Sequence, residues 1–376
     1  MKEAIAPAGG DIGSLWESVV ESIREEYLSE TQSYPWIIGF SGGKDSTVLA
    51  QAVFEALLSI APSRRTRAIH IVSNDTLVES PLVVAHLVRS QAAIREAATN
   101  WRLPVTVVTT TPAPEQTFWV LLIGRGYPSP NQKMRWCTDR LKIAPTSQYI
   151  RACVNKDGAA IVILGVRLDE SNSRRASILK HENLVQSNLT PHTNLPGAFI
   201  YRPIVHLTTD QIWEIIWCFP PPWGGSHEGL IKLYKDSQGG ECPFVTSPED
   251  APGCGTTSSR FGCWACTVVT KDKSLQNVVD AGEQRYSPLI EFRDWLKEIR
   301  NDPQWRSVER RNGKIQYSLT GKHIPGPFTI EARHKILARL LQTQEAFGVE
   351  LISKREVDLI KRLWADELLR KGNRHG

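Results

Sequence analysis

The sequence contains no run of 18 apolar residues, so we expect no membrane-spanning helix and no membrane partner. Its first residues, Met1 to Ser14, are polar and rich in glycine and alanine. They lack the cationic stretch leading into an apolar one that marks a signal peptide. We therefore expect a cytoplasmic protein whose seven cysteines are reduced thiols, because a chain of this size needs no disulfide staples. No internal repeat is visible.

Positive charge is in only modest excess over negative charge. The chain has 376 residues, of which 41% are hydrophobic, and its formal net charge is +5. This composition supports a full core and fits two domains, or one large domain with an appendage. A mild basic excess suits an anionic partner such as ATP or nucleic acid, although most proteins with such an excess are simply soluble.

Short apolar runs alternate with helical patterns through the first half of the chain. This alternation predicts a Rossmann-like α/β fold, a parallel sheet with helices on both faces. Ligands bind such sheets at the carboxyl ends of the strands, near the point where strand order reverses. The expected strands are 36–40, 67–72, 105–110 and 160–166, and the expected helices are one capped by Ser14 and Glu17, one from Ser46 to about Ile60, and one over 81–99.

The character of the sequence changes after His206. The stretch 239–266 is rich in cysteine, glycine, proline and serine, so it cannot bury much apolar surface by itself and something else should hold it together. We expect three regions: a nucleotide-binding domain at 1–206, a cysteine-rich region at 207–287 and a helical region at 288–376.

The C-terminal region is charged and predicted to be mainly helical. Thr329 should cap a helix that reaches about Phe347, and Ser353 with Glu356 should cap the next. The basic residues of this last helix could follow a DNA backbone, although a solvated helix face is the better interpretation. They are Lys354, Arg355, Lys361, Arg362, Arg370, Lys371 and Arg374.

The strongest single motif is a glycine-rich turn between the first expected strand and its helix, Phe40-Ser41-Gly42-Gly43-Lys44-Asp45-Ser46. It is not a Walker A loop, which needs Gly-x-x-x-x-Gly-Lys-Ser/Thr. Glycines let backbone approach a ligand closely, and N–H groups at the start of a helix attract anions. Lys44 adds positive charge, whereas Asp45 beside an anion suits a metal-binding or orienting role. An ordinary strand–helix turn is the alternative.

A second motif follows the fourth expected strand, Gly165-x-Arg167-x-x-Glu170-Ser171-x-x-Arg174. Arginines are fixed cations that can bind phosphate oxygens with two hydrogen bonds. Glu170 could anchor one of the two arginines. A solvated charged loop is the alternative. Asp75 and Thr76, after the second strand, are weaker candidates for contact with a nucleotide, because aspartate and threonine at a strand end are common turn residues.

Five cysteines form a candidate metal or redox site. Cys263 and Cys266 form a Cys-x-x-Cys pair, with Cys254 and Cys242 shortly before it and Cys137 far upstream. Zinc, an iron–sulfur cluster and a redox dithiol all remain open from the spacing, since zinc sites and iron–sulfur clusters both use four thiolates. The other two cysteines lie in apolar surroundings and are expected to be buried thiols: Cys153 and Cys218.

The glycine-rich turn resembles the PP-loop of the ATP pyrophosphatase superfamily, and the second motif resembles a signature of its PAPS reductase-like branch. The resemblance implies that ATP is cleaved between its α- and β-phosphates, with catalysis by Lys44, Asp45, Arg167 and Arg174. The residues implied to bind the nucleotide are Phe40, Ser41, Gly42, Gly43, Lys44, Asp45, Ser46, Asp75, Thr76, Gly165, Arg167 and Glu170.

The segment Cys137-Thr138-Asp139-Arg140-x-Lys142-x-x-Pro145 resembles the upstream cysteine motif of iron–sulfur PAPS and APS reductases. That group has two adjacent cysteines, and this chain has Trp136 in place of the first. The resemblance therefore implies a [4Fe–4S] cluster with one ligand from elsewhere, on Cys137, Cys254, Cys263 and Cys266. Cys242 is left over, either as a substitute ligand or as a catalytic thiol that carries persulfide sulfur.

Longer segments resemble the DndC-type sulfurtransferases of DNA phosphorothioation, and SspD proteins are similar in kind. These segments are 118–128 with 135–140, Gly240-Glu241-Cys242-Pro243, 260–269 and Gly326-Pro327-Phe328-Thr329. The resemblance implies that ATP, with Mg²⁺, adenylates a DNA backbone phosphate, and that persulfide sulfur then replaces AMP. The implied partners are DNA, a cysteine desulfurase and other phosphorothioation subunits of the DndD and DndE type.

Three other functions remain open. A PAPS or APS reductase would not cleave ATP, and the Lys44-Asp45 pair favours retained ATP chemistry. A tRNA thiolase of the same superfamily would act on a base instead of a phosphate. A non-catalytic iron–sulfur scaffold subunit would release no pyrophosphate from ATP.

Overall fold

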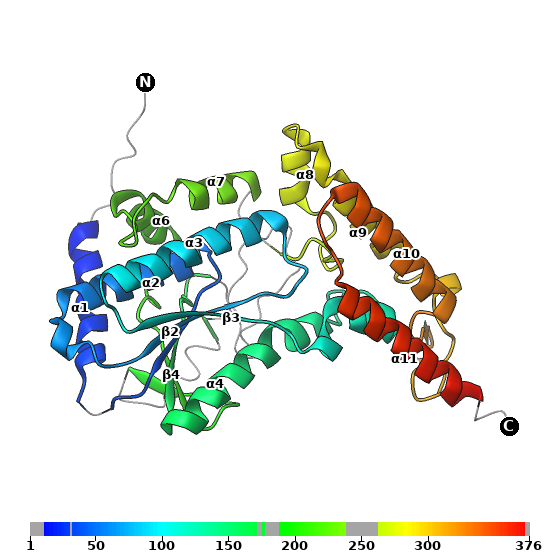
Figure 1. The fold of residues 1–376 in the computed structure, drawn as a ribbon, viewed down its shortest axis with the longest axis horizontal. Helices are drawn as coiled ribbons and strands as arrows, with labels where there is room; N and C mark the ends of the chain where they lie inside the picture. The colour runs from blue at the N-terminus through cyan, green and yellow to red at the C-terminus, as the bar shows by residue number, and fades with distance from the viewer. Residues whose placement is uncertain (1–10, 31, 171–174, 177–187, 238–261, 373–376) are drawn as a thin grey trace.

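The computed structural model describes residues 11–30, 32–170, 175–176, 188–237 and 262–372. In this part of the chain a sheet covered by helices fills one side of the molecule, and C-terminal helices form the other (Figure 1). No described helix combines the length and apolar character needed to cross a membrane.

The main sheet of the described residues has six strands in the order β3-β2-β1-β4-β6-β5, and all neighbours are parallel except β5 and β6. The central strands β1 and β4 are buried along their whole length, which explains their continuous apolar sequences. The strands are β1 (Trp36–Gly39), β2 (Ile69–Asn74), β3 (Val105–Thr110), β4 (Ala160–Ile163), β5 (Leu189–Pro191) and β6 (Ala198–Tyr201).

Helices cover both faces of this sheet, which confirms the expected fold class (Figure 1). One face packs through Ile38 and Ile71 against α1 (Ile12–Leu28), α2 (Lys44–Ser59), α3 (Pro81–Asn100), α6 (Thr209–Cys218) and α7 (Glu228–Ser237). The other face packs through Ile37 and Val162 against α4 (Ala144–Asp157).

A second core joins the middle of the chain to its C-terminal helices. The helices are α8 (Lys273–Asp280), α9 (Ser287–Ile299), α10 (Ile330–Phe347) and α11 (Lys354–Gly372). They pack with the buried segment 118–123, whose Trp119 Nε1 donates a hydrogen bond to the Leu351 carbonyl at 2.7 Å. Trp364 of α11 in turn donates to the Ile123 carbonyl at 3.0 Å. The segment after β3 is thus fixed by residues more than 200 positions away in the sequence.

Most expected elements are confirmed, with shifts at their ends. The strand 105–110 is observed as expected, the second strand begins at Ile69, and the fourth ends at Ile163. Thr329 caps α10, and Ser353 and Glu356 form the expected capping box of α11. The regions 1–206, 207–287 and 288–376 stay a prediction as domains.

Two expectations about local structure are wrong. The first helix is capped by Asp11, whose carboxylate accepts from the Gly13 N–H, and Ser14 lies inside the helix. Cys153 is buried as expected, but Cys218 is exposed. Cys218 is the last residue of α6, where the helix leaves the core that its residues Ile212 and Ile215 contact.

Candidate functional site

The glycine-rich turn and the second motif meet at the point where strand order reverses. The chain proceeds from β1 outward to β2 and β3, whereas β4 adds to the opposite side of β1. The segments that follow β1 and β4 therefore leave the sheet side by side. A Cβ atom added to Gly165 would lie 3.1 Å from the Asp45 carbonyl oxygen, a tight contact that glycine avoids. This is the position where doubly wound folds bind ligands.

The glycine-rich turn holds its shape through its own hydrogen bonds. Gly42 has a φ of +73°, a conformation that glycine adopts without strain. The Ser46 hydroxyl donates to the Gly43 carbonyl at 3.0 Å, and the Ser41 N–H contacts the same hydroxyl at 3.3 Å. Gly43 precedes α2 as its N-cap and offers no side chain to the first-turn amides. These contacts within the turn support its conformation.

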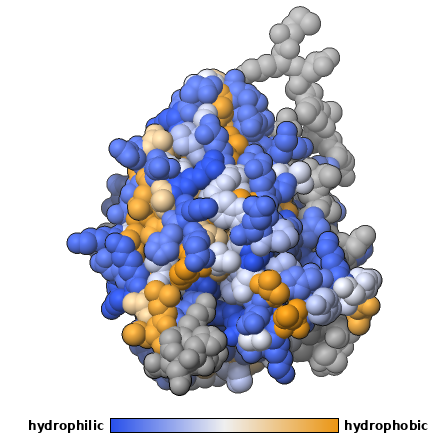
Figure 2. Space-filling model, turned by 90° about the vertical axis from the view of Figure 1, so that its right-hand side faces the viewer, coloured by the Kyte–Doolittle hydropathy of each residue, from blue (hydrophilic) through white to orange (hydrophobic). Residues whose placement is uncertain are grey.

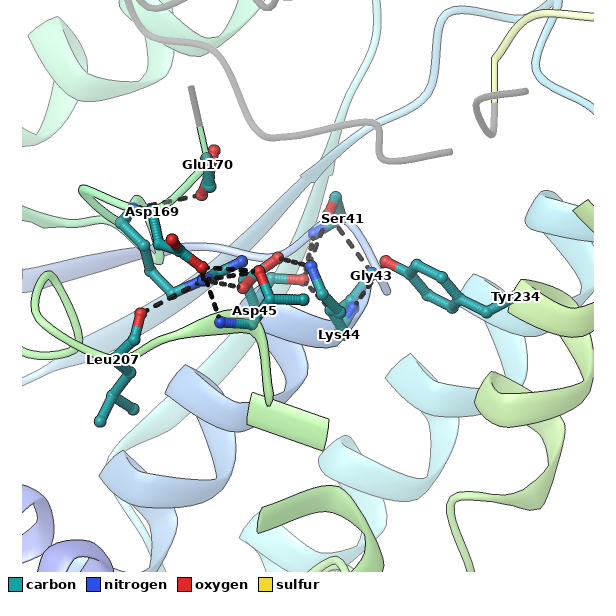
Figure 3. A network of polar contacts seen from close by, with 11 residues as sticks. Ser41, Gly43, Lys44, Asp45, Asp169, Glu170, Leu207 and Tyr234 are labelled. Atoms are coloured by element: carbon teal, nitrogen blue, oxygen red, sulfur yellow. Dashed lines mark hydrogen bonds and ion pairs between the residues drawn. The ribbon is translucent and has the colours of Figure 1, made fainter. Parts of the chain in front are cut away.

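Asp45 links two buried cations across the site (Figure 3). One carboxylate oxygen accepts from Lys44 Nζ at 2.9 Å, and the other accepts from Arg167 Nε at 2.5 Å. The side chains of Lys44 and Arg167 are 2% and 1% exposed, so neither charge is well solvated. A buried cation needs an anionic partner, and a bound phosphate could compete with Asp45 for both.

The Arg167 guanidinium is held by several hydrogen bonds, but one of its nitrogens has no partner among the described residues. Its Nη1 donates to the Leu207 carbonyl and to the Thr209 hydroxyl, both at 3.2 Å. Its Nη2 is buried and has no hydrogen-bond partner within the part of the chain described. Glu170, expected to anchor an arginine, accepts from the Arg167 backbone N–H at 3.2 Å, while Asp45 holds the guanidinium. The unsatisfied N–H groups can receive an anion.

Tyr234 of α7 is a site residue that the sequence did not indicate. Its hydroxyl oxygen accepts from the Lys44 backbone N–H at 3.0 Å, which is one of the first-turn amides of α2 (Figure 3). The ring is buried against Trp213, with ring centroids 4.9 Å apart. The tyrosine thus occupies a donor that an anion at this helix start would use. Residues 190 positions apart make this contact, so no local pattern could have indicated it.

His86 of α3 supports the turn from another side and was also missed. Its Nε2 lies 3.1 Å from the Gly42 carbonyl oxygen. Burial lowers the pKa of His86, and its hydrogen bond to Gly42 works in the opposite direction. A neutral imidazole donating to this carbonyl is the form that burial favours.

Asp75 and Thr76 lie at the carboxyl end of β2, beside Cys263. The Asp75 carboxylate accepts from the Leu77 N–H at 2.8 Å, and burial raises the pKa of Asp75. The Thr76 hydroxyl donates to Glu79 at 3.0 Å and lies 3.4 Å from the Cys263 sulfur. Both side chains therefore have protein partners, and their contact with a nucleotide stays a prediction.

Backbone pairing fixes the Cys-x-x-Cys motif to this same loop. Cys263 forms a β-bridge with Glu79, and the Trp264 N–H donates to the Val78 carbonyl at 3.0 Å. Burial, and then the nearby Glu79 carboxylate, raise the pKa of the Cys263 thiol well above its usual range. A bound metal would remove that proton, because thiolates are the ligand form.

The structure describes three of the four expected cluster ligands, Cys137, Cys263 and Cys266. Cys137 and Cys263 contact the second core, and the Cys266 N–H donates to the Cys263 carbonyl. Among the described residues, no three histidines, cysteines or acids are arranged to hold a metal ion. Cys254, Cys242, Ser171 and Arg174 lie outside the described residues. The described cysteines therefore do not by themselves fit a [4Fe–4S] cluster, and the ligand set stays a prediction.

The site fits a nucleotide's phosphates better than it fits Mg²⁺. The glycine-rich turn, a helix start and the unsatisfied Arg167 Nη2 all suit an anion. The Asp45 carboxylate is already engaged by Lys44 and Arg167, and Asp169 accepts from the Thr209 N–H and hydroxyl. These hydrogen bonds lower the pKa of Asp169, so it is an anion at neutral pH.

Comparisons with known proteins give only distant likenesses. No family model matches the chain, and no curated protein does. A PAPS reductase from Candida auris is 13% identical with a TM-score of 0.33, covering 57% of this chain and 88% of its own. The U34-tRNA thiolase NcsA from Methanococcus maripaludis, with its [4Fe–4S] cluster, is 11% identical with a TM-score of 0.32, covering 77% and 81%. An NH₃-dependent NAD synthetase from Campylobacter jejuni is 13% identical with a TM-score of 0.37, covering 78% and 97%. TM-scores this low carry no argument about function.

Proposed function

We propose that this chain is an ATP pyrophosphatase that activates a DNA backbone phosphate as an adenylate, so that sulfur can replace one of its oxygens. The observation that carries the proposal is the glycine-rich turn at the reversal of strand order, joined through Asp45 to Arg167. The sequence resemblance to PP-loop enzymes and DndC-type sulfurtransferases supplies the reaction and the acceptor.

The arrangement suits the two outer phosphates of ATP. In our proposal they lie against the turn 41–46, where Lys44 and the open Nη2 of Arg167 neutralise their charge. The α-phosphorus then faces away from the turn, toward an incoming nucleophile. Asp45 holds both cations in position until the phosphates arrive, so the site is ordered before binding.

Sulfur transfer needs two displacements. A non-bridging oxygen of the DNA phosphate attacks the α-phosphorus of ATP, and pyrophosphate leaves. The terminal sulfur of a persulfide supplied by a cysteine desulfurase then attacks the DNA phosphorus, and AMP leaves with that oxygen. We propose Cys242 as the thiol that carries this persulfide. A second thiol then attacks the sulfur of Cys242 and forms a disulfide with it, which leaves the terminal sulfur on the DNA phosphorus. The proposal also includes a [4Fe–4S] cluster and subunits of the DndD and DndE type, to which we assign no step. The proposed ligands of the cluster are Cys137, Cys254, Cys263 and Cys266.

Sulfur incorporation tests the proposal. The chain is incubated anaerobically with ATP, DNA, cysteine and a cysteine desulfurase, and the digested DNA is examined by mass spectrometry for phosphorothioate dinucleotides. We expect them with the wild type and with Arg151→Ala, an exposed arginine of α4, and not with Arg167→Ala. Thiolated bases in tRNA, with unmodified DNA, would support the thiolase instead and contradict the DNA acceptor.

A further inference from the structure

Residues 306–326 form an ordered ribbon that stands outside both large cores. We call this segment the 306–326 ribbon. It contains β7 (Gln316–Tyr317) and β8 (His323–Ile324), joined by a turn in which the Gly321 N–H donates to the Ser318 carbonyl at 2.9 Å. A preceding turn is closed by the Arg310 N–H and the Lys314 carbonyl at 2.8 Å. These tight turns define its shape without apolar burial.

The base of the ribbon is firmly anchored. Arg306 is buried, and its Nε donates to the Gly326 carbonyl at 2.7 Å. A Cβ atom added to Gly326 would lie 1.7 Å from the Glu309 carbonyl oxygen, so the two ends of the ribbon touch there. The Phe328 N–H donates to the Gly126 carbonyl at 2.8 Å and ties the base to the second core.

The ribbon presents apolar side chains to solvent. Ile315 and Tyr317, two residues apart on the first arm of the ribbon, are 49% and 61% exposed, and Leu319, in the turn between β7 and β8, is fully exposed. Side chains two residues apart in an extended strand share a face. Tyr317 pairs with His323 across the ribbon, and their rings are 5.9 Å apart. An ordered strand that exposes its apolar face is typical of an interaction surface.

The charges on the ribbon favour an anionic partner. Its acidic residue is Glu309, against five basic residues, Arg306, Arg310, Arg311, Lys314 and Lys322. Arg306 is buried at the base of the ribbon, whereas Lys314 and Lys322 are exposed, next in sequence to Ile315 and His323. Figure 2 shows that on the side of the molecule formed by the C-terminal helices, separate apolar patches interrupt a mainly hydrophilic surface.

We propose that the 306–326 ribbon binds the single-stranded DNA on which the enzyme acts, an inference that rests on the proposed function. Tyr317 and His323 offer ring faces on which unpaired bases stack, and Ile315 and Leu319 extend this apolar surface. Lys314 and Lys322 neutralise phosphates on either side. A second copy of the chain, pairing through the free edge of β7, would be the competing occupant.

The test is binding of a fluorescent oligonucleotide, followed by anisotropy without ATP at several salt concentrations. We expect Tyr317→Ala to weaken binding of single-stranded DNA at least about fivefold. The double variant Lys314→Gln, Lys322→Gln should lower the slope of log affinity against log salt by about 1.4. The matched controls change an exposed tryptophan, Trp101→Ala, and two exposed cations of α4, Arg151→Gln with Lys156→Gln, and should leave binding unchanged.

The outcomes separate this inference from the proposed function. Ribbon variants that bind DNA like the wild type would overturn the inference. Ribbon variants that bind DNA normally but no longer self-associate in sedimentation would also overturn it, because the ribbon would then bind a second copy of the chain. Tighter binding of duplex than of single strand would overturn the base-stacking role. Failure of the proposed function would give a different result. The wild type would still bind DNA through the ribbon, but it would release no pyrophosphate from ATP.

Discussion

The carboxylate of Asp45 accepts a hydrogen bond from Arg167 Nε at 2.5 Å, and so joins the start of α2 to the segment that follows β4. The two residues are 122 positions apart, and the reversal of strand order at the neighbouring strands β1 and β4 brings them together. The same carboxylate holds Lys44. One anion between two buried cations is an arrangement that a phosphate can enter by replacing the carboxylate.

Asp45→Asn should separate binding from turnover. The variant leaves Lys44 and Arg167 buried without their anion, so we expect a loss of about 2 kcal/mol in the free energy of unfolding. Added pyrophosphate should supply the missing charge and raise the melting temperature more than in the wild type, while turnover falls roughly 100-fold. Thermal unfolding with and without pyrophosphate measures the first effect. Asp366→Asn, an exposed change in α11, is the control. An equal or smaller response of Asp45→Asn to pyrophosphate would contradict the exchange of anions.

Tyr234→Phe should tighten anion binding at the turn. The change frees the Lys44 N–H and keeps the ring against Trp213. A competing hydrogen bond of about 1 kcal/mol corresponds to roughly fivefold higher affinity for pyrophosphate, and the free protein should lose about the same stability. Isothermal calorimetry checks the affinity. Tyr201→Phe, which removes a hydroxyl bonded to Ser22, should change stability without changing affinity. Weaker binding by Tyr234→Phe would mean that the hydroxyl helps to hold the anion.

The protein should lose stability as the pH falls below about 6.5, the ordinary pKa of histidine. Burial lowers the pKa of His70, His86 and His227, so between their folded pKa values and 6.5 the unfolded chain binds more protons. The free energy of unfolding therefore rises with pH in that window, and the stability is lost on acidification. Urea unfolding at pH 7.5 and pH 5.5 measures the difference.

The histidine at the glycine-rich turn should account for part of this pH dependence. His86→Gln removes one titrating group, so the stability difference between the two pH values should shrink. His206→Gln, an exposed change, should leave the difference as in the wild type. If His86→Gln and the wild type lose the same stability between pH 7.5 and pH 5.5, then His86 binds its proton as strongly in the folded protein as in the unfolded chain. That result would contradict the expected effect of its burial.

Anaerobically purified protein should contain about four iron atoms per chain, with matching sulfide. Cys263→Ser and Cys266→Ser should each lower the iron content sharply, because removing one thiolate opens the coordination of the cluster. Cys218→Ser, a change at an exposed cysteine, should not. Stoichiometric zinc without iron would contradict the cluster and favour a structural zinc site.

The sequence predicted the elements whose cause is local. The run Val105–Thr110 consists of β-branched residues and by itself predicts a strand. Thr329 likewise predicts the start of α10, because its side chain caps the first turn of that helix. The strands β5 and β6 were missed because three or four residues give too short a pattern. They are strands through tertiary pairing, β6 with β4 and the edge strand β5 with β6.

The site was predicted in its parts and not in its assembly. Lys44, Asp45 and Arg167 were all identified, but no local pattern indicated that Asp45 holds the Arg167 guanidinium from 122 positions away. The expectation that Glu170 anchors one of the two arginines stays a prediction, because Arg174 lies outside the described residues. Tyr234 and His86 reach the turn from α7 and α3 through helix packing on the sheet. Neither lies in a motif, so only the tertiary structure could reveal them.

The position at which ATP is cut tests the central claim most directly. Nucleotide products are separated by chromatography after incubation with DNA, for the wild type and for Arg167→Lys, which keeps the charge but cannot make the paired contacts to Asp45, Leu207 and Thr209. We predict AMP and pyrophosphate in equal amounts from the wild type, and much less of both from the variant. ADP and inorganic phosphate as the products would contradict cleavage between the α- and β-phosphates, and with it the account of this site.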